Sequence, residues 1–143
     1  MRGFQNVTGY DVPLPKRATS HSAGYDICTT EDALLEAGDT VVLKTGLKAY
    51  MGADEVLLIF IRSSIGIKHD ITLSNGTGVI DSDYYNNEDN EGHIHIALTN
   101  CGYNDFLITK GDRLAQGVFV KYLITDDDTA SGVRSGGIGS TGK

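Results

Sequence analysis

The apolar run 55–62 ends at Arg62, and Ser63 and Ser64 follow it directly. A cation beside two hydroxyls, at a possible helix N-terminus, gathers the hydrogen-bond donors that a phosphate group requires. The same residues also fit a helix N-cap, in which Ser63 or Ser64 accepts hydrogen bonds from unpaired backbone N–H groups. Taken alone, these residue types favour the cap.

A richer cluster begins at Asn75-Gly76, a dipeptide typical of tight hairpins, and runs on through the segment 78–85. Asp81 and Asp83 are two residues apart, so on a strand their carboxylates would point to the same side. The backbone groups of a tight hairpin could also bind the edge of a nucleobase. The bland alternative is an ordinary Asn-Gly turn followed by solvent-facing aspartates.

Three further clusters are weaker when taken singly. Asp26, in Ala-Gly-Tyr-Asp-Ile, fits a surface residue of an edge strand as well as a site residue. Gln116 lies in an apolar run after a Gly-Asp turn, where a polar side chain should have a partner. The segment 134–143 is rich in glycine and carries one arginine, Arg134, so it could fold over a polyphosphate. With little to bury, residues 125–143 also fit a disordered tail, which composition alone favours.

Short strands are the elements expected to position these clusters. The chain has 143 residues, which suits a single domain over 1–143. Strand-like runs are followed by turn signals about every ten residues, and a single helical turn is expected after Arg62. The pattern predicts an all-β sandwich, barrel or jelly roll. The strand-like runs cover residues 40–50, 55–62, 93–99 and 117–124.

Composition excludes several classes of protein. The net charge of −7 argues against a broad nucleic-acid surface, although not against a small anionic ligand. No apolar run approaches the roughly 20 residues that span a bilayer, and the first residues lack the apolar core of a secretory signal. A cytoplasmic protein with no membrane partner is therefore expected.

Cys28 and Cys101 have no zinc-site or disulfide pattern and are expected to be small core residues. The acidic runs 88–91 and 126–128 are expected to stay solvated.

In their order and spacing, the five clusters resemble the five motifs of the trimeric dUTPase family, over about residues 13–141. The resemblance implies a β jelly roll that assembles as a homotrimer with active sites shared between subunits. It also implies a flexible C-terminal arm, residues 125–143, that closes over substrate at a neighbouring interface. The implied reaction is Mg2+-dependent hydrolysis of dUTP to dUMP and pyrophosphate. This reaction keeps uracil out of DNA and supplies dUMP for thymidylate synthesis.

The same resemblance implies a role for each motif. Asp81 matches the general base that activates water for attack on the α-phosphorus, and an aspartate of ordinary pKa is ionised for that task at neutral pH. Tyr84 matches the residue that packs on deoxyribose and leaves no space for a 2′-hydroxyl. The residues matching the uracil-binding hairpin are Asn75, Gly78, Val79 and Ile80.

The remaining motifs match phosphate and metal positions. Asp26 resembles the acid that contacts Mg2+ through water, in keeping with the usual way in which proteins hold this ion. Gln116 resembles the residue that positions the α-phosphate and the attacking water. Phosphate contacts are implied for Arg62, Ser63 and Ser64, and a γ-phosphate clamp for Arg134 with Gly137, Ile138, Gly139, Ser140 and Thr141. Together these groups would stabilise developing charge.

The sequence departs from the family pattern in two places. Ile138 stands where the family usually has an aromatic residue that stacks on uracil, and residues 85–91 make the region after the third motif longer than usual. His93 or His95 could replace the missing aromatic cover. Alternatively, Ile138 covers the base by apolar contact alone.

Two other functions compete with the dUTPase interpretation. A dCTP deaminase shares the fold and the second motif, but it needs a differently placed glutamate, and no strand glutamate after the third motif suggests one. A non-enzymatic binding module on the same scaffold is the other alternative. The presence of Asp81, Arg62, Gln116 and Arg134 together argues against an inactive site.

Overall fold

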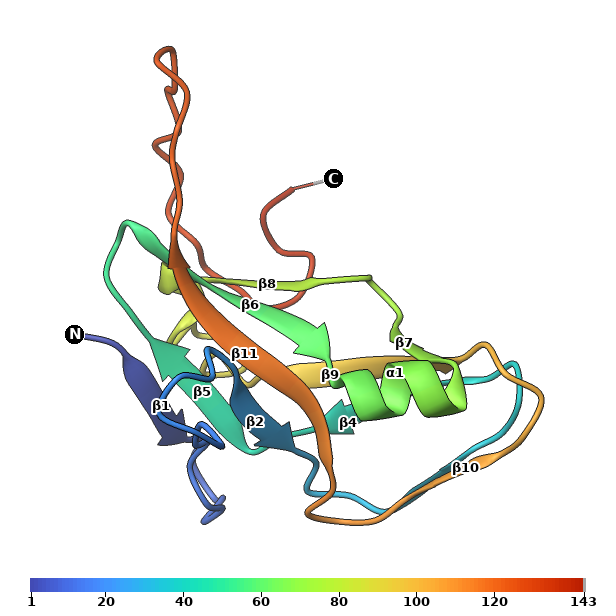
Figure 1. The fold of residues 1–143 in the computed structure, drawn as a ribbon. Coiled ribbons are helices and arrows are strands. Elements are labelled where there is room, and N and C mark those ends of the chain that lie inside the picture. The colour runs from blue at the N-terminus through green and yellow to red at the C-terminus, as the bar shows by residue number, and fades with distance from the viewer. Residues whose placement is uncertain (143) are drawn as a thin grey trace.

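Every described strand pair in this computed structural model, which describes residues 1–142, is antiparallel. A four-stranded sheet has the order β2 (Tyr25–Cys28), β11 (Arg113–Lys121), β6 (Glu55–Ile61), β8 (Gly78–Asp81). A three-stranded sheet has the order β4 (Thr40–Lys44), β9 (His95–Asn100), β7 (Ile71–Leu73). Two strand pairs complete the fold, β1 (Gly3–Asn6) with β5 (Leu47–Tyr50) and β3 (Ala33–Leu35) with β10 (Phe106–Ile108) (Figure 1). The all-β prediction is confirmed.

The two larger sheets share one apolar core. In β6 the side chains of Leu57 and Ile59 are buried, and in β9 buried and half-buried residues alternate as in a strand with one face on a core. Gly117 lies opposite Ile59, where an added Cβ would touch Leu57 at 3.0 Å, so β11 packs closely on its neighbour. The fully buried side chains of largest volume include Ile27, Leu35, Leu43, Leu57, Ile96, Leu98, Ile108 and Leu114.

The helix after β6 is longer than predicted. Helix α1 spans Ser63–His69, with Arg62 as its N-cap residue and no side-chain capping hydrogen bond. The N-cap hypothesis for Ser63 or Ser64 is therefore wrong, because both are the first helical residues and both side chains are exposed. Their hydroxyls remain available to a ligand.

The Asn75-Gly76 turn does not close a hairpin between the strands that flank it. Gly76 has the left-handed φ of 74° that such a turn requires. However, β7 pairs with β9, whereas β8 pairs with β6, so the turn carries the chain from one sheet to the other. The dipeptide sets the local reversal of the chain, and long-range packing selects the partner of each strand.

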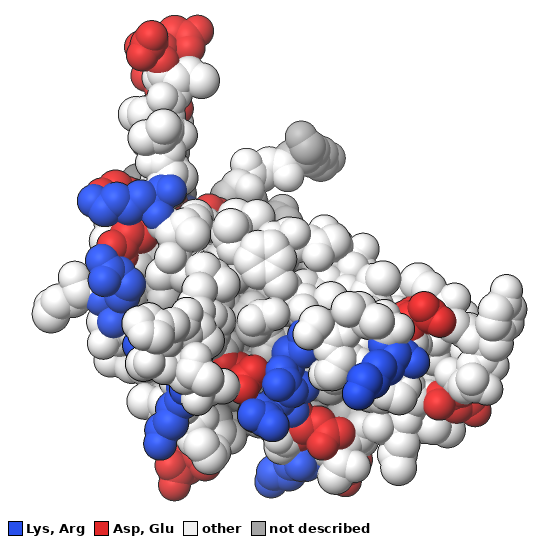
Figure 2. Space-filling model, viewed as in Figure 1, with Lys and Arg blue, Asp and Glu red and all other residues white. Residues whose placement is uncertain are grey.

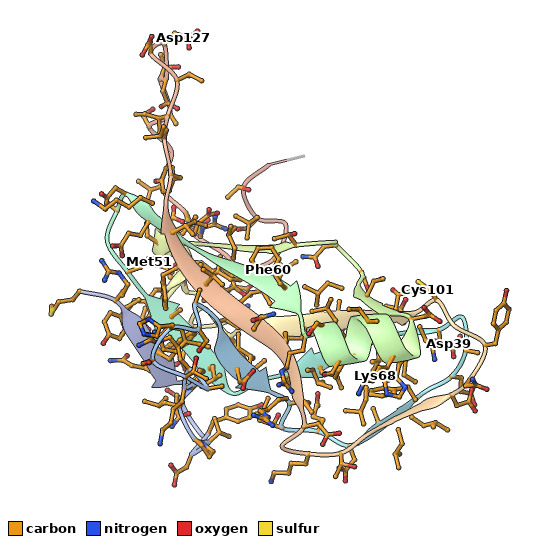
Figure 3. All side chains as sticks on the ribbon, in the orientation of Figure 1. Asp39, Met51, Phe60, Lys68, Cys101 and Asp127 are labelled. Atoms are coloured by element: carbon orange, nitrogen blue, oxygen red, sulfur yellow. The ribbon has the colours of Figure 1, made fainter. Side chains whose placement is uncertain are left out.

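After β11 the chain projects from the body and returns along β8 (Figure 1). Asp127 lies at the outer end of this projection (Figure 3), and acidic side chains gather there (Figure 2). Residues 126–128 are exposed as predicted. We call residues 122–142 the C-terminal segment. Leu123 and Val133 in it are almost fully exposed, at 97% and 94%.

Two smaller predictions have different outcomes. Cys101 is exposed and Cys28 is half-buried, so the prediction that both are core residues is wrong for Cys101. Burial raises the pKa of the Cys28 thiol. No helix within residues 1–142 combines the length and the apolar character needed to cross a membrane.

Candidate active site

A cavity of about 300 Å³ lies between β8, β9 and the C-terminal segment. Most of the residues predicted for uracil, sugar and arm contacts meet in its wall, although they come from two distant parts of the sequence. The predicted residues that line it are Asn75, Gly78, Val79, Ile80, Asp81, Tyr84, Arg134, Gly137, Ile138, Gly139 and Thr141. Ser140 is the one predicted arm residue that does not line it.

Arg134 joins the C-terminal segment to the end of β8. Its Nη2 donates to Asp81 Oδ2 at 2.6 Å, and its Nε donates to Asp83 Oδ1 at 2.7 Å. The arginine side chain is only 11% exposed, while the two carboxylates are about half exposed. Asp83 lies in the 3-10 helix Ser82–Tyr84 and not on a strand, yet both carboxylates reach one guanidinium. The two-residue spacing was the sequence signal for Asp83.

Tyr84 lines the cavity, and two hydrogen bonds hold its hydroxyl. Its side chain is buried, its hydroxyl donates to the His93 carbonyl at 2.8 Å, and Asn90 Nδ2 donates to that hydroxyl at 2.9 Å. Burial raises the pKa of Tyr84, so the phenol stays protonated at neutral pH. The Arg134 guanidinium carbon lies 5.8 Å from the centre of the Tyr84 ring, within cation–π range.

The two histidines proposed as a cover for the base have different surroundings. His93 is buried, and its Nε2 accepts a hydrogen bond from the Gly46 N–H at 2.9 Å. It does not line the cavity, so its proposed role as a cover is wrong. Burial lowers the pKa of His93 to about 4, which keeps the accepting nitrogen free of a proton. His95 faces outward from β9 and lines the cavity with Ile138, so cover by one of these two stays a prediction.

A second polar cluster lies on β2, β11 and the start of α1. Asp26 forms a salt bridge with Arg62, whose Nε lies 3.0 Å from Asp26 Oδ1, and accepts a hydrogen bond from Arg113 Nη1 at 3.2 Å. Gln116 lies directly across the ladder from Asp26, with its carboxamide against Gly24, where an added Cβ would come within 2.2 Å of the amide oxygen. Arg113 was not predicted as a site residue, and only its place beside the Gly-Asp turn could have suggested it.

The two clusters are far apart within the chain. Asp81 lies opposite Val56 at one end of β6, whereas Arg62 follows its other end, six residues further along. At about 3.3 Å per residue, this separates them by roughly 20 Å. The residues predicted for the base and sugar are thus brought together with Arg134 and most of the predicted γ-phosphate clamp, while Arg62, Ser63, Ser64 and Gln116 are held elsewhere.

Comparison with known proteins decides which family builds such a site. A dUTPase family model matches residues 10–142. The deoxyuridine 5′-triphosphate nucleotidohydrolase of Lactococcus lactis is 47% identical, over 99% of this chain and 98% of its own length. This chain belongs to the dUTPase family. Members of this family hydrolyse dUTP to dUMP.

Solved dUTPase structures agree with this assignment. The dUTPase from Streptococcus mutans is 45% identical and superposes with a TM-score of 0.82, covering 87% of this chain and 98% of that one. The dUTPase from phage phi11 of S. aureus has a TM-score of 0.77 over 94% of this chain and 99% of its own. At 22% identity, it shows only that the fold is shared.

One part of this dUTPase was misjudged from the sequence. The acidic run 88–91 is not simply solvated, because Glu91 accepts hydrogen bonds from Thr8 and Lys48, and Asp89 accepts one from the Gly137 N–H at 3.3 Å. A loop of acidic and amide residues has no periodicity that predicts such contacts. The partners lie more than 40 residues away in sequence.

Proposed function

We propose that this dUTPase converts dUTP and water to dUMP and pyrophosphate, with Asp81 as the general base. Asp81 accepts a proton from water, the water oxygen bonds to the α-phosphorus, and the bond from that phosphorus to the α–β bridging oxygen breaks. Pyrophosphate leaves with the electron pair of that bond. The half-exposed Asp81 carboxylate at the rim of the cavity carries this proposal, since a base must reach a water beside the substrate.

Recognition of uracil is assigned to the backbone of β8 and to the Asn75 amide. Gly78 lies so close to β6 that an added Cβ would sit 2.9 Å from the Ile59 Cβ, so the strand presents backbone there without a side chain. A binding site made of fixed backbone donors and acceptors would distinguish uracil from cytosine by the order of those groups. The narrow space beside it excludes the methyl group of thymine.

The sugar is assigned to Tyr84. Because its hydroxyl is held by His93 and Asn90, the ring cannot swing away from an added 2′-hydroxyl without breaking two hydrogen bonds. Discrimination against UTP is therefore steric. Removing a buried hydrogen-bond partner costs about 1–3 kcal/mol, which would oppose such a movement.

The phosphates are assigned to Arg62, Ser63, Ser64 and Gln116 of a second copy of the chain. Within one chain these groups lie roughly 20 Å from Asp81, too far for one triphosphate to bridge while its α-phosphorus stays beside the base. A homotrimer with shared sites would bring the two clusters together, and the exposed apolar residues Leu123 and Ile124 offer surface to bury in it. In the chain described here, Arg134 instead contacts its own Asp81.

The residues present fit an Mg2+ ion that arrives on the substrate. No group of three or more carboxylate, histidine or cysteine side chains suited to a metal occurs within residues 1–142. Both carboxylate oxygens of Asp26 are already paired with arginines, so Asp26 would contact only a water of the hydrated ion. The bound ion would neutralise phosphate charge, as Mg2+ does at triphosphates elsewhere.

The test is pyrophosphate release from dUTP, UTP, dTTP and dCTP with Mg2+, comparing wild type with Asp81→Asn. Asp127→Asn is the matched control, since Asp127 is exposed at the tip of the projection. Release from dUTP alone, at least about 100-fold slower in Asp81→Asn and unchanged in Asp127→Asn, supports the proposal. Ammonia release from dCTP would instead favour the deaminase. No turnover of any nucleotide would favour a binding module.

The proposed setting follows from the reaction. Removing dUTP keeps uracil out of DNA, and dUMP is the precursor for thymidylate synthesis. We propose that the reaction takes place in the cytoplasm, with dUTP and further copies of the chain as partners, and without nucleic acid or membrane.

A further inference from the structure

The loop of residues 86–91 is built around the buried side chain of Asn87. Its Nδ2 donates to the Tyr84 carbonyl at 2.8 Å and to Asn90 Oδ1 at 2.8 Å, and its Oδ1 accepts from the Asp89 N–H at 3.0 Å. The loop therefore has a defined shape that does not depend on the C-terminal segment.

The far end of the loop is tied to the body of the protein. The Glu91 carboxylate accepts from the Thr8 N–H at 3.2 Å and from Lys48 Nζ at 3.3 Å. These donors lower the pKa of Glu91, so the carboxylate is ionised at neutral pH. Lys48 also donates to Asn86 Oδ1. The loop is thus fixed at both ends and can act as a rigid surface for something that docks on it.

The C-terminal segment docks on this surface at Gly137. The Gly137 N–H donates to Asp89 Oδ2 at 3.3 Å, and Gly137 is buried. An added Cβ on Gly137 would lie 2.9 Å from both Asp89 Oδ2 and Asn90 Nδ2, so both side-chain ends would have to shift away to accommodate it. The neighbouring residues Ile138 and Gly139 line the nucleotide cavity, whereas Asp89 does not.

We propose that Asp89 is a positioning residue, which holds the C-terminal segment in place over the nucleotide cavity by accepting the Gly137 N–H. The proposal rests on the function proposed above. Arg134 and Gly137 attach the segment to the body at two points, and Ile138, which follows Gly137 directly, is thereby held in the wall of the cavity. Asp89 thereby acts on the substrate only through the backbone of the segment.

The first test measures binding of a dUTP analogue with an imido group in place of the α–β bridging oxygen, by calorimetry on the full chain. Asp89→Ala is expected to raise Kd about three- to tenfold, the range for one ordinary hydrogen bond, since the contact of 3.3 Å is a long one. Asp89→Asn keeps an acceptor oxygen and should stay within about twofold of wild type. Glu88→Ala is the control, because Glu88 is the adjacent exposed acid of the same charge. An equal loss in Glu88→Ala and Asp89→Ala would overturn the proposal.

A double-mutant cycle with Gly137→Ala tests whether Asp89 acts through the segment. Gly137→Ala alone displaces the Asp89 carboxylate from the segment, so adding Asp89→Ala should raise Kd no further. If the two effects multiply instead, Asp89 acts by another route and the proposal is wrong.

Trypsin cleavage after Arg134, without any nucleotide, separates this proposal from the proposed function. Faster cleavage in Asp89→Ala than in Glu88→Ala is expected, because the segment spends more time away from the body. Equal cleavage rates in the two variants would refute the positioning role of Asp89, even if the enzyme is active. If the wild-type protein turns over no nucleotide, the proposed function is refuted. The cleavage rates then still decide whether Asp89 positions the C-terminal segment.

Discussion

His93 offers a quantitative test of how the fold holds an uncharged group. Its Nε2 must be free of a proton to accept from the Gly46 N–H, and its pKa falls from 6.5 to about 4, mainly through burial and then through the nearby His95. Below pH 6.5 the unfolded chain binds a proton that the folded chain resists. The stability contributed by neutral His93 is therefore fully present above pH 6.5 and is lost as the pH falls towards 4.

The two pKa values set the size of the effect. A difference of 2.5 pKa units corresponds to about 3 kcal/mol in total, of which about 2 kcal/mol is lost by pH 5. We expect His93→Gln to lower the free energy of unfolding at pH 7.5 through lost packing. Its side-chain oxygen can still accept from Gly46 but does not titrate. The difference between wild type and His93→Gln should accordingly shrink by about 2 kcal/mol between pH 7.5 and pH 5.

Urea unfolding at fixed protein concentration, repeated from pH 7.5 to pH 4.5, measures this difference. His21→Gln serves as the matched control, since His21 is an exposed histidine. A gap between wild type and His93→Gln that stays constant with pH would refute the assignment of a neutral, buried acceptor. The assignment would also be refuted if His21→Gln changed the pH dependence of the free energy of unfolding as much as His93→Gln does.

Two further outcomes follow from the geometry. Gly92→Ala should destabilise the protein by about 2 kcal/mol more than Gly38→Ala in the same unfolding assay. Both glycines have a left-handed φ, but of the two only Gly92 would place an added Cβ against a neighbour, 2.6 Å from the Tyr84 carbonyl oxygen. Equal losses of stability in the two variants would contradict this reasoning. EDTA should abolish pyrophosphate release, and added Mg2+ should restore it. EDTA should shift the Tm of the protein by less than about 1 °C, since the described residues hold no metal cluster. A large fall in Tm would reveal a structural ion.

Much of the site could be predicted because its chemistry depends on residue type. Asp81, Arg134 and Tyr84 were identified from short motifs, and the structure places all three on one cavity. The strand core of β6 was equally readable, since a short run of apolar residues fits only a buried strand or a buried helix. Local signals of this kind do not depend on what the rest of the chain does.

Prediction failed where one contact joins residues far apart in sequence. The partner of β8, the buried acceptor role of His93 and the hydrogen bond from Gly137 to Asp89 all involve such pairs. In a continuous strand His93 and His95 would face the same side, but β9 begins only at His95, so alternation does not place the side chain of His93.

By itself, the sequence determined the strand-rich class, the order of the motifs and the residue types that can bind a nucleotide, because these follow from composition and spacing. Only the tertiary structure decided that the chain crosses between sheets at Asn75-Gly76, and that Asp26 and Asp81 belong to clusters at opposite ends of β6. It also decided that the 86–91 loop meets Gly137. The reason is physical: such contacts are selected by the burial and hydrogen bonding of the whole chain, and no short segment carries that information.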